Sequence, residues 1–399
     1  MGELRRMKEA YRILPVYAGD VSGVASALYE LGGMVVMHDP SGCNSTYNTH
    51  DEVRWYRKES YIFISGLNTR DAVLGNDKKF MDDIVAAATG LSPAPKFIAL
   101  CNSPIPFLNG TDFKGIARLL EKRLQIPVFY VKTNGMHDYV DGAGRAFSCF
   151  AQKLLPADKR LQEERVVPAD PSAPVKINLL GLTPLDFADY QNVENLKEHL
   201  KKAGFDVVAN WSYGTCFEDV MQSGKADVNL VLSATGLPLA KTLQNMYGQP
   251  YVAGLPLGSL SEEIYRQLRL AAAGEDFCTF PAKETPSVTG QTNGKTLYLI
   301  GEALQCKSLG YHYVADRGFR RAVVLCPLEQ SEELISSTNG DILTVGEEQI
   351  EEYFKDMKNT EILCDPMYEP VLPADAKIWK YPSLSFSGRI FGGHFPVFF

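Results

Sequence analysis

The alternation of short apolar runs with longer segments of helical periodicity limits the fold of this chain more than any other feature. The runs are partly β-branched, and each is followed by turn residues and then by a longer periodic segment. Strands this apolar, alternating with helices, are typical of parallel sheets that are covered on both faces. The pattern predicts an α/β fold of repeated strand–turn–helix units, with strands in the runs at 33–38, 96–101, 128–132, 175–182, 206–211, 227–233, 250–256, 295–301, 321–326, 341–345 and 361–366.

Two of the intervening segments illustrate the helical pattern. The segment 113–126 places five apolar residues on one predicted face, namely Phe113, Ile116, Leu119, Leu120 and Leu124. The segment that begins at Val193 leads into the strand at 206–211, and Gly204 is suited to end that helix in a left-handed conformation.

Two polar segments divide the chain. Residues 166–176 are rich in proline, and residues 282–296 are polar and precede a new apolar run. A chain of 399 residues is too long for one hydrophobic core. We therefore expect three Rossmann-like domains, at 1–170, 171–290 and 291–399.

Composition excludes several classes of protein. The net charge of −8 and the pI near 5.4 argue against a nucleic-acid-binding protein, which needs a basic face. No apolar stretch is long enough for a membrane helix, and the first residues lack the pattern of a signal peptide. Eight cysteines without a CxxC pair are too sparse for a disulfide scaffold. These observations favour a cytoplasmic protein.

Two cysteines follow apolar runs in the first predicted domain. Cys43 lies in the turn His-Asp-Pro-Ser-Gly-Cys, and Cys101 ends the run 96–101. Ligands of open α/β sheets bind beyond the carboxyl ends of the strands, so both thiols are candidates for one site. Thiolates are the preferred ligands of iron–sulfur clusters, which usually need four of them. Burial as ordinary packing residues is the alternative, because free cysteine is among the most buried residue types.

Three further features are weaker candidates for function. Cys216 lies where a loop turns into a helix, a position that can lower the pKa of a thiol, and it could line a pocket. His137 follows the strand at 128–132 and could act as a proton donor, or it could be a solvated surface residue. Residues 54–58 form a small basic patch, which is either a solvated face or a docking surface for an acidic partner.

The first 150 residues resemble the nitrogenase component 1 family. That family carries a His-Gly-Pro-x-Gly-Cys turn, and later a strand that ends in cysteine and is followed by a helix and an Ile-Pro-Val strand. Here the turn spans 38–43, with Asp39 in the glycine position, and Cys101 lies at the expected interval downstream. The likeness continues through 226–258 and into the C-terminal Ser-Gly turn, so that it covers nearly the whole chain.

The resemblance implies a cluster at a subunit interface. Subunits of the family pair about a pseudo-twofold axis, and cysteines from both partners hold an iron–sulfur cluster there. Cys43 and Cys101 match the second and third cysteines of that set. No cysteine stands where the first is expected, and Asp20 is the nearest possible ligand, unless it only caps a helix that begins at Val21. Two thiolates from each of two subunits would suffice for one [4Fe–4S] cluster.

Departures from the family pattern bear on the substrate. Ser233 and Phe391 stand where the catalytic nitrogenase subunit has the cysteine and histidine that hold its iron–molybdenum cofactor, and His394 lies three residues beyond. We therefore expect no iron–molybdenum cofactor, and a substrate other than dinitrogen.

The resemblance also implies partners and two alternative roles. As an oxidoreductase subunit, the chain would pair with a homologous subunit, in a homodimer or a heterotetramer. A separate ATP-dependent iron–sulfur reductase would supply the electrons, because the chain has no ATP-binding motif. The alternatives are a non-catalytic scaffold for metallocofactor assembly and a cluster-free small-molecule-binding relative.

Overall fold

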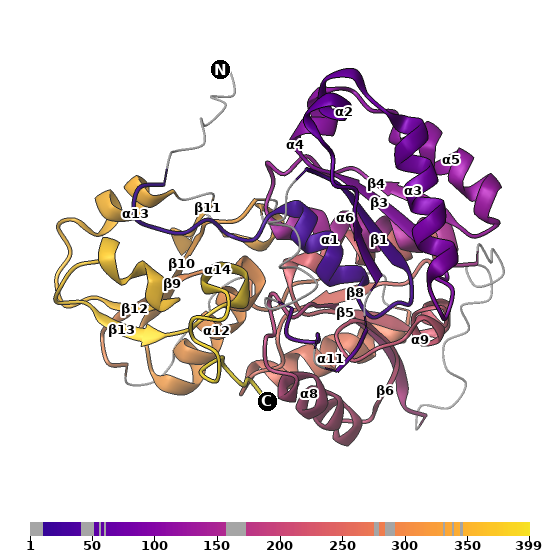
Figure 1. The fold of residues 1–399 in the computed structure, drawn as a ribbon. Coiled ribbons are helices and arrows are strands. Elements are labelled where there is room, and N and C mark those ends of the chain that lie inside the picture. The colour runs from indigo at the N-terminus through magenta and orange to yellow at the C-terminus, as the bar shows by residue number, and fades with distance from the viewer. Residues whose placement is uncertain are drawn as a thin grey trace, which may run out of the picture.

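The computed structural model describes residues 11–40, 52–55, 57–59, 61–156, 173–274, 279–283, 292–329, 332–336, 339–343 and 346–399. Three separate sheets, in which every paired strand is parallel to its neighbour, occupy successive parts of the chain (Figure 1). We call each sheet with its helices the first, second and third unit. The predicted α/β architecture is confirmed.

The first unit has the strand order β2-β1-β3-β4. Successive residues of its two central strands point to opposite faces, one packed on α3 and α5, the other on α1 and α6. The unit contains β1 (Met34–His38), β2 (Tyr61–Ile64), β3 (Ile98–Asn102), β4 (Val128–Val131), α1 (Asp20–Leu28), α2 (Thr69–Leu74), α3 (Asp77–Gly90), α4 (Pro104–Leu108), α5 (Phe113–Leu124) and α6 (Tyr139–Leu154).

The second unit has the strand order β6-β5-β7-β8. Two 3-10 turns, η2 (Ser223–Lys225) and η3 (Ala234–Gly236), flank its strand β7. The other elements are β5 (Val175–Leu182), β6 (Phe205–Ser212), β7 (Val228–Val231), β8 (Tyr251–Ala253), α8 (Gln191–Lys202), α9 (Phe217–Val220), α10 (Leu237–Tyr247) and α11 (Leu260–Ala272).

The third unit has the strand order β11-β10-β9-β12-β13. Its strands are β9 (Thr296–Ile300), β10 (Arg321–Cys326), β11 (Ile342–Leu343), β12 (Glu361–Cys364) and β13 (Lys377–Lys380). Its helices are α12 (Ala303–Arg317), α13 (Glu347–Phe354) and α14 (Leu384–Ser387), with the 3-10 turns η4 (Glu332–Leu334) and η6 (Pro366–Val371).

The apolar runs of the sequence form the central strands of all three sheets. Two edge strands, β2 and β13, were not predicted. Strand β2 was missed although its four half-buried residues are all apolar, whereas β13 begins and ends with an exposed lysine and gives no continuous apolar run. The helix at 113–124 was predicted, but Leu119 is 51% exposed and Ala117 takes its place on the buried face. Gly204 has a φ of +86°, which agrees with the predicted helix end.

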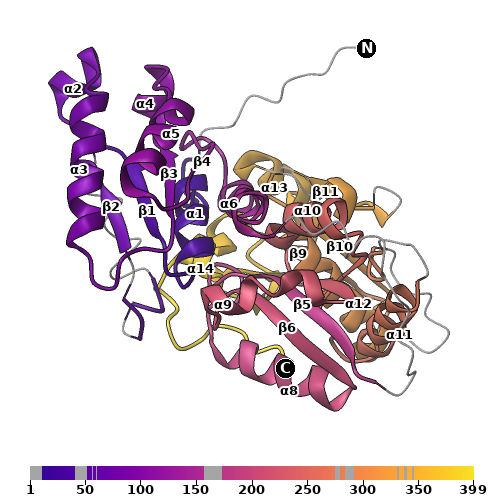
Figure 2. The ribbon, with the colours of Figure 1, turned by 90° about the vertical axis from the view of Figure 1, so that its right-hand side faces the viewer.

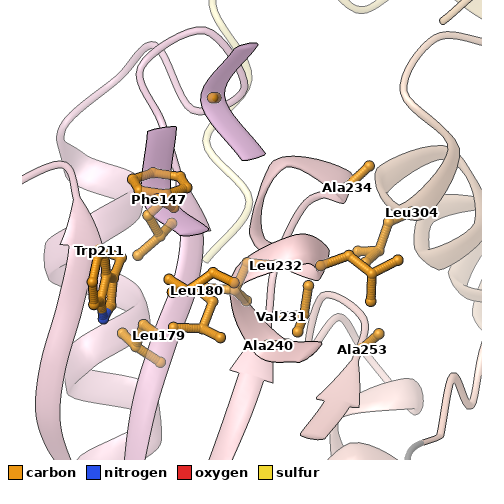
Figure 3. Close-up of a cluster of buried hydrophobic side chains, with 14 of the residues drawn as sticks. Phe147, Leu179, Leu180, Trp211, Val231, Leu232, Ala234, Ala240, Ala253 and Leu304 are labelled. Atoms are coloured by element: carbon orange, nitrogen blue, oxygen red, sulfur yellow. The ribbon is translucent and has the colours of Figure 1, made fainter. Parts of the chain in front are cut away.

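The predicted domain boundaries, after residues 170 and 290, lie outside the described residues and stay predictions. One cluster of buried apolar residues contains side chains from all three units, and two further clusters lie within the first unit and mainly within the third. Figure 3 shows Phe147 of α6 near Trp211 of β6, and Leu304 of α12 near Leu232 of the second unit. The units are therefore packed against one another through apolar side chains.

Segments at both ends of the described chain cross between units. Residues 11–18 run along the third unit before the chain enters α1 (Figure 1). There Glu347 of α13 accepts hydrogen bonds from the backbone amides of Arg12, Ile13 and Leu14. The C-terminal residues leave the third unit and end beside α8 of the second (Figure 2). Among the described residues, no helix is both long and apolar enough to span a membrane.

Candidate functional site

The carboxyl ends of β1 and β3 lie side by side in the first sheet. In the register of this parallel pair, Met37 lies opposite Cys101, and His38 lies opposite Asn102. The turn that carries Cys43 begins directly after β1, and Cys43 itself lies outside the described residues. The position of β1 therefore supports the expectation that both cysteines belong to the same edge of the sheet.

Cys101 points to the face of the sheet that packs on α1 and α6. Its thiol is fully buried within the single chain and donates a 3.4 Å hydrogen bond to the carbonyl oxygen of Val36. Burial raises the pKa of Cys101, and the carboxylates of Asp20 and Asp39 raise it further. The thiol is thus protonated in the isolated chain at neutral pH.

Asp20, the first residue of α1, is committed to backbone hydrogen bonds. Its carboxylate accepts from the amides of Val21 at 2.8 Å, Asn134 at 2.8 Å and Gly135 at 3.0 Å. Burial raises the pKa of Asp20, and these three donors partly offset that effect. The carboxylate therefore ties the start of α1 to the loop after β4. Helix α1 begins at Asp20 itself, its N-cap is Gly19 and no side chain caps it, so the alternative expectation that Asp20 caps a helix beginning at Val21 is wrong. The role of Asp20 as a cluster ligand stays a prediction.

His38 lies on the opposite face of the same sheet from Cys101. Its ring stacks on Phe80 with a centroid distance of 3.9 Å, and Nδ1 lies 2.7 Å from the hydroxyl of Ser65. Burial lowers the pKa of His38 to about 4, so the imidazole is neutral. These contacts favour a structural role for His38 in the turn after β1.

The donor set bears on whether the site fits an iron–sulfur cluster. Cys101 offers a soft donor whose only hydrogen bond within the described chain is a weak one to a carbonyl, so that it is chemically suited to bind iron. No group of three His, Cys, Asp or Glu side chains that could hold a metal occurs among the described residues. The described part of one chain therefore fits as a contributor to a cluster site and does not complete one.

Helices α1 and α6 approach one another unusually closely beside this site. A Cβ at Gly142 would lie 2.6 Å from the Cα of Asp20, and one at Gly23 would lie 2.8 Å from the amide nitrogen of Ala143. Only glycine at both positions permits this contact. The contact fixes the start of α1 over the carboxyl end of β3.

A cavity of about 190 Å³ lies where the three units meet. We call it the three-unit pocket. One side of α1 lines it, together with the loop after β5 and the region of α14. Its lining residues are Val16, Ala18, Ser22, Ala25, Ser26, Glu52, Pro184, Leu185, Leu384, Ser385, Phe386 and Gly388. Because β5 ends at Leu182, the pocket lies beyond the carboxyl end of a parallel strand, where ligands of α/β folds bind.

Arg54 forms a buried ion cluster next to this pocket. Its guanidinium binds Glu52 through Nε at 2.7 Å and through Nη2 at 2.8 Å, and it lies 3.5 Å from Glu30. It also donates to the carbonyl oxygen of Ser26 and covers the ring of Tyr29 at 4.5 Å. The interpretation of 54–58 as a uniform basic surface patch is therefore wrong for Arg54, which is 2% exposed because acidic residues surround it.

A buried carboxyl network joins the three units behind the pocket. Asp186 accepts hydrogen bonds from Tyr139 of the first unit at 2.6 Å and from Ser233 at 2.9 Å. Glu302 of the third unit accepts from the amide of Ala234 at 3.0 Å. Burial raises the pKa of both carboxyl groups, and the charge of Asp186 adds to the effect on Glu302.

Ser233, which stands in the position of a cofactor cysteine, is part of this network. Its hydroxyl is fully buried and also contacts the carbonyl oxygen of Gly181 at 2.7 Å. His394 is exposed on the C-terminal segment. These positions agree with the expectation that the chain itself does not hold an iron–molybdenum cofactor, which stays a prediction.

The two weaker candidates lie apart from the three-unit pocket. Cys216 is the N-cap of the four-residue helix α9, and burial raises its pKa, so that the predicted lowering is wrong. Nδ1 of His137 lies 2.7 Å from Glu329 of the third unit, and its backbone carbonyl accepts from the amide of Asp20. Neither side chain lines the pocket. The catalytic role suggested for His137 stays a prediction.

Sequence reasoning missed Ser26, Arg54 and Asp186 as parts of a site. Serine on an apolar helix gives no functional signal. Arg54 binds the nearby Glu52, but its contacts with Ser26 and Glu30 join residues far apart in the chain. The same holds for the contacts of Asp186 with Tyr139 and Ser233. Asp186 in the turn after an apolar run was the one available signal, because it occupies the ligand-binding end of β5.

Comparisons with known proteins match this architecture. A sequence profile of the nitrogenase component 1 type oxidoreductases matches residues 22–270. The nitrogenase iron-molybdenum cofactor biosynthesis protein NifE of Clostridium pasteurianum is 28% identical over 228 residues, which cover 54% of this chain and 45% of that protein. One subunit of the light-independent protochlorophyllide reductase of Synechococcus elongatus is 23% identical over 257 residues, which cover 63% of this chain and 50% of that protein.

The fold agrees with the same assignment. A solved structure of nitrogenase Cp1 at pH 6.5 superposes with a TM-score of 0.68 at 16% identity, covering 96% of this chain and 89% of that one. The chain spans about half the length of the curated relatives it matches. Since the family profile covers more than half of the sequence, this chain belongs to the nitrogenase component 1 type oxidoreductase family.

Proposed function

We propose that this chain is one subunit of a nitrogenase-like oxidoreductase. Cys43 and Cys101 would hold an iron–sulfur cluster jointly with the same residues of a homologous subunit, and a [4Fe–4S] cluster would fit four such thiolates. An ATP-dependent iron–sulfur reductase would supply electrons, and a substrate other than dinitrogen would occupy the three-unit pocket. The role of the cluster, when bound, is to accept and pass on single electrons.

The course of α1 is the observation that carries this proposal. Its first residue, Asp20, lies close enough to Cys101 to raise the pKa of that thiol, while Ser22, Ala25 and Ser26 line the pocket. One short helix therefore connects the thiol at the end of β3 with the cavity between the units. The same helix is fixed on α6 by the Gly23 and Gly142 contacts.

The chain's own residues have separate tasks in this proposal. Cys101 must lose its proton to bind iron, and its carboxylate neighbours oppose that loss, so iron itself must provide the compensating positive charge. Asp20 holds the loop at 134–135 against α1, which keeps the edge of the sheet in place. Apolar side chains of Leu185 and Phe386 limit water in the pocket.

A scaffold for metallocofactor assembly is the second candidate function. The similarity to NifE, whose name describes cofactor biosynthesis, favours it. The lining of the three-unit pocket favours it less, because its described residues include neither cysteine nor histidine to hold a metallocofactor.

Iron content tests the cluster assignment. The protein is purified without oxygen, and iron and acid-labile sulfide are measured per chain, with an EPR spectrum after dithionite. We expect about two irons per chain, which corresponds to one [4Fe–4S] cluster per dimer. Cys43→Ser and Cys101→Ser should each lose most of the iron.

Cys216→Ser is the matched control, because it removes a thiol from a helix cap where serine is well tolerated. It should retain the iron of the unmodified protein. Folded, dimeric protein without iron after reconstitution would sink the proposal, as would a Cys101→Ser variant with unchanged iron. If the cluster can be reduced and its iron then stays on the protein instead of moving to an acceptor protein, the oxidoreductase role is favoured over the scaffold role.

A further inference from the structure

We propose that the three-unit pocket binds a small organic molecule that is neutral or positively charged, with one apolar part and one hydrogen-bonding group. This inference rests on the proposed function only in taking the pocket as the substrate site. It specifies the class of substrate, which neither the family assignment nor the fold provides.

The size and the lining of the pocket set the first limit. A cavity of about 190 Å³ is smaller than the roughly 300–1,000 Å³ that is usual for drug-sized ligands. Leu185, Leu384 and Phe386 provide an apolar wall. The hydroxyl-bearing residues Ser22 and Ser26 lie together on α1, so the lining is amphipathic.

Ser26 provides a specific sign of a missing partner. The residue is 5% exposed, and its hydroxyl has no hydrogen-bond partner among the described residues. Its backbone carbonyl, in contrast, accepts from Arg54 and from Ser212. A buried hydroxyl without a partner is costly, and a ligand that donates to it or accepts from it would remove that cost.

The charges around the pocket disfavour an anion. Glu52 is the only ionisable side chain among the described lining residues. The nearest cation, Arg54, already binds Glu52 with two nitrogens and lies beside Glu30. The positive N-terminal end of α1 is likewise matched by the carboxylate of Asp20. An anionic ligand would therefore find no unmatched positive charge in the described surroundings.

The donor types disfavour a sulfur-bridged metal cluster in this pocket. Such clusters are held by thiolates and imidazoles, whereas the described lining offers hydroxyls and one carboxylate. Hydroxyls suit alcohols, amides and amines, which they can both donate to and accept from. The chemistry that fits is an uncharged or cationic polar group attached to a compact apolar body.

Three probes of the same shape and different charge test the inference: benzyl alcohol, benzylamine and benzoate. Binding of each to the full chain, purified without oxygen, is measured by ligand-observed NMR. Benzyl alcohol or benzylamine should bind at least about tenfold more tightly than benzoate, since a lost charge match or hydrogen bond costs about that factor. Ser26→Ala should weaken the bound probe about tenfold, because it removes the hydroxyl and adds no atom to the lining.

Ala25→Leu adds volume inside the pocket and should abolish probe binding. Ala86→Leu, on the exposed side of α3, is its control and should leave binding unchanged. If Ala25→Leu fails to fold, Ser26→Ala decides the question alone. Benzoate binding as tightly as the other two probes, no binding by any probe, or unchanged binding to Ser26→Ala would each overturn the inference.

Iron content, measured on the same preparations, separates this inference from the proposed function. Protein that contains the cluster and binds no probe would overturn the inference and leave the oxidoreductase proposal standing. Protein that binds benzylamine and contains no iron would overturn the oxidoreductase proposal and leave the inference about the pocket standing.

Discussion

Gly142 of α6 lies so close to Asp20 of α1 that a Cβ at position 142 would be 2.6 Å from the Asp20 Cα, and closer still to its carbonyl oxygen. Both contacting groups are backbone, which cannot move without shifting a whole helix. The position of α1, and with it the edge of the sheet and the three-unit pocket, thus depends on the absence of a side chain at residue 142.

Gly142→Ala should therefore destabilise the protein. Overpacking of a well-packed core typically costs about 1–3 kcal/mol, and rigid backbone on both sides favours the upper end. Gly90→Ala is the matched control, because nothing lies within 4 Å of a Cβ at that helical position. It should be neutral or slightly stabilising. Urea unfolding of both variants measures the difference, and equal stability would show that the helices separate without cost.

Replacement of Arg54 should be much more harmful than its place in a charged segment suggests. Arg54→Met leaves the buried carboxylate of Glu52 without its cation, a change that typically costs about 3–5 kcal/mol, whereas Glu30 keeps its ion pair with Lys58. Lys78→Met breaks an ion pair with Asp82 whose lysine is 85% exposed, and should cost less than about 1 kcal/mol. Thermal unfolding measures both variants, and equal melting temperatures would contradict the prediction.

The buried pair of Asp186 and Glu302 should make stability depend on pH. A carboxyl group whose pKa is raised on folding keeps its proton in the native state at pH values where the unfolded chain has lost it. The free energy of unfolding should therefore fall as the pH rises above about 4 and through the raised pKa values.

Glu302→Gln should flatten this dependence, because it removes the group whose ionisation opposes folding. Glu262→Gln, an exposed residue of α11, is the control and should keep the dependence of the unmodified protein. Urea unfolding between pH 5 and pH 8 measures both slopes. An unchanged slope in Glu302→Gln would mean that the native network ionises without cost.

The central strands and the cysteine at the end of β3 could be predicted from sequence, because buried parallel strands leave continuous apolar runs. The edge strand β13 could not, since exposed lysines begin and end it, whereas β2 is a four-residue apolar run that could have been predicted and was missed. The burial of Arg54 could not be predicted, because Glu30 lies in the turn after α1 and Ser212 belongs to β6 of the second unit. The three-unit pocket is lined by residues more than 350 positions apart, which no local pattern connects.

The C-terminal segment that borders the pocket should depend on one buried amide. Asn192 of α8 donates to the carbonyl oxygen of Pro396 at 2.9 Å and accepts from the amide of Phe398 at 2.7 Å, and it is fully buried. Asn192→Ala removes both bonds, at about 1 kcal/mol each, so residues 388–399 should detach more often and be cut faster by chymotrypsin at their phenylalanines. Gln191→Ala, on the exposed side of the same helix, should leave the cleavage rate unchanged. Equal rates for the two variants would mean that Phe398, packed on Phe187 with a centroid distance of 5.7 Å, holds the segment without the amide.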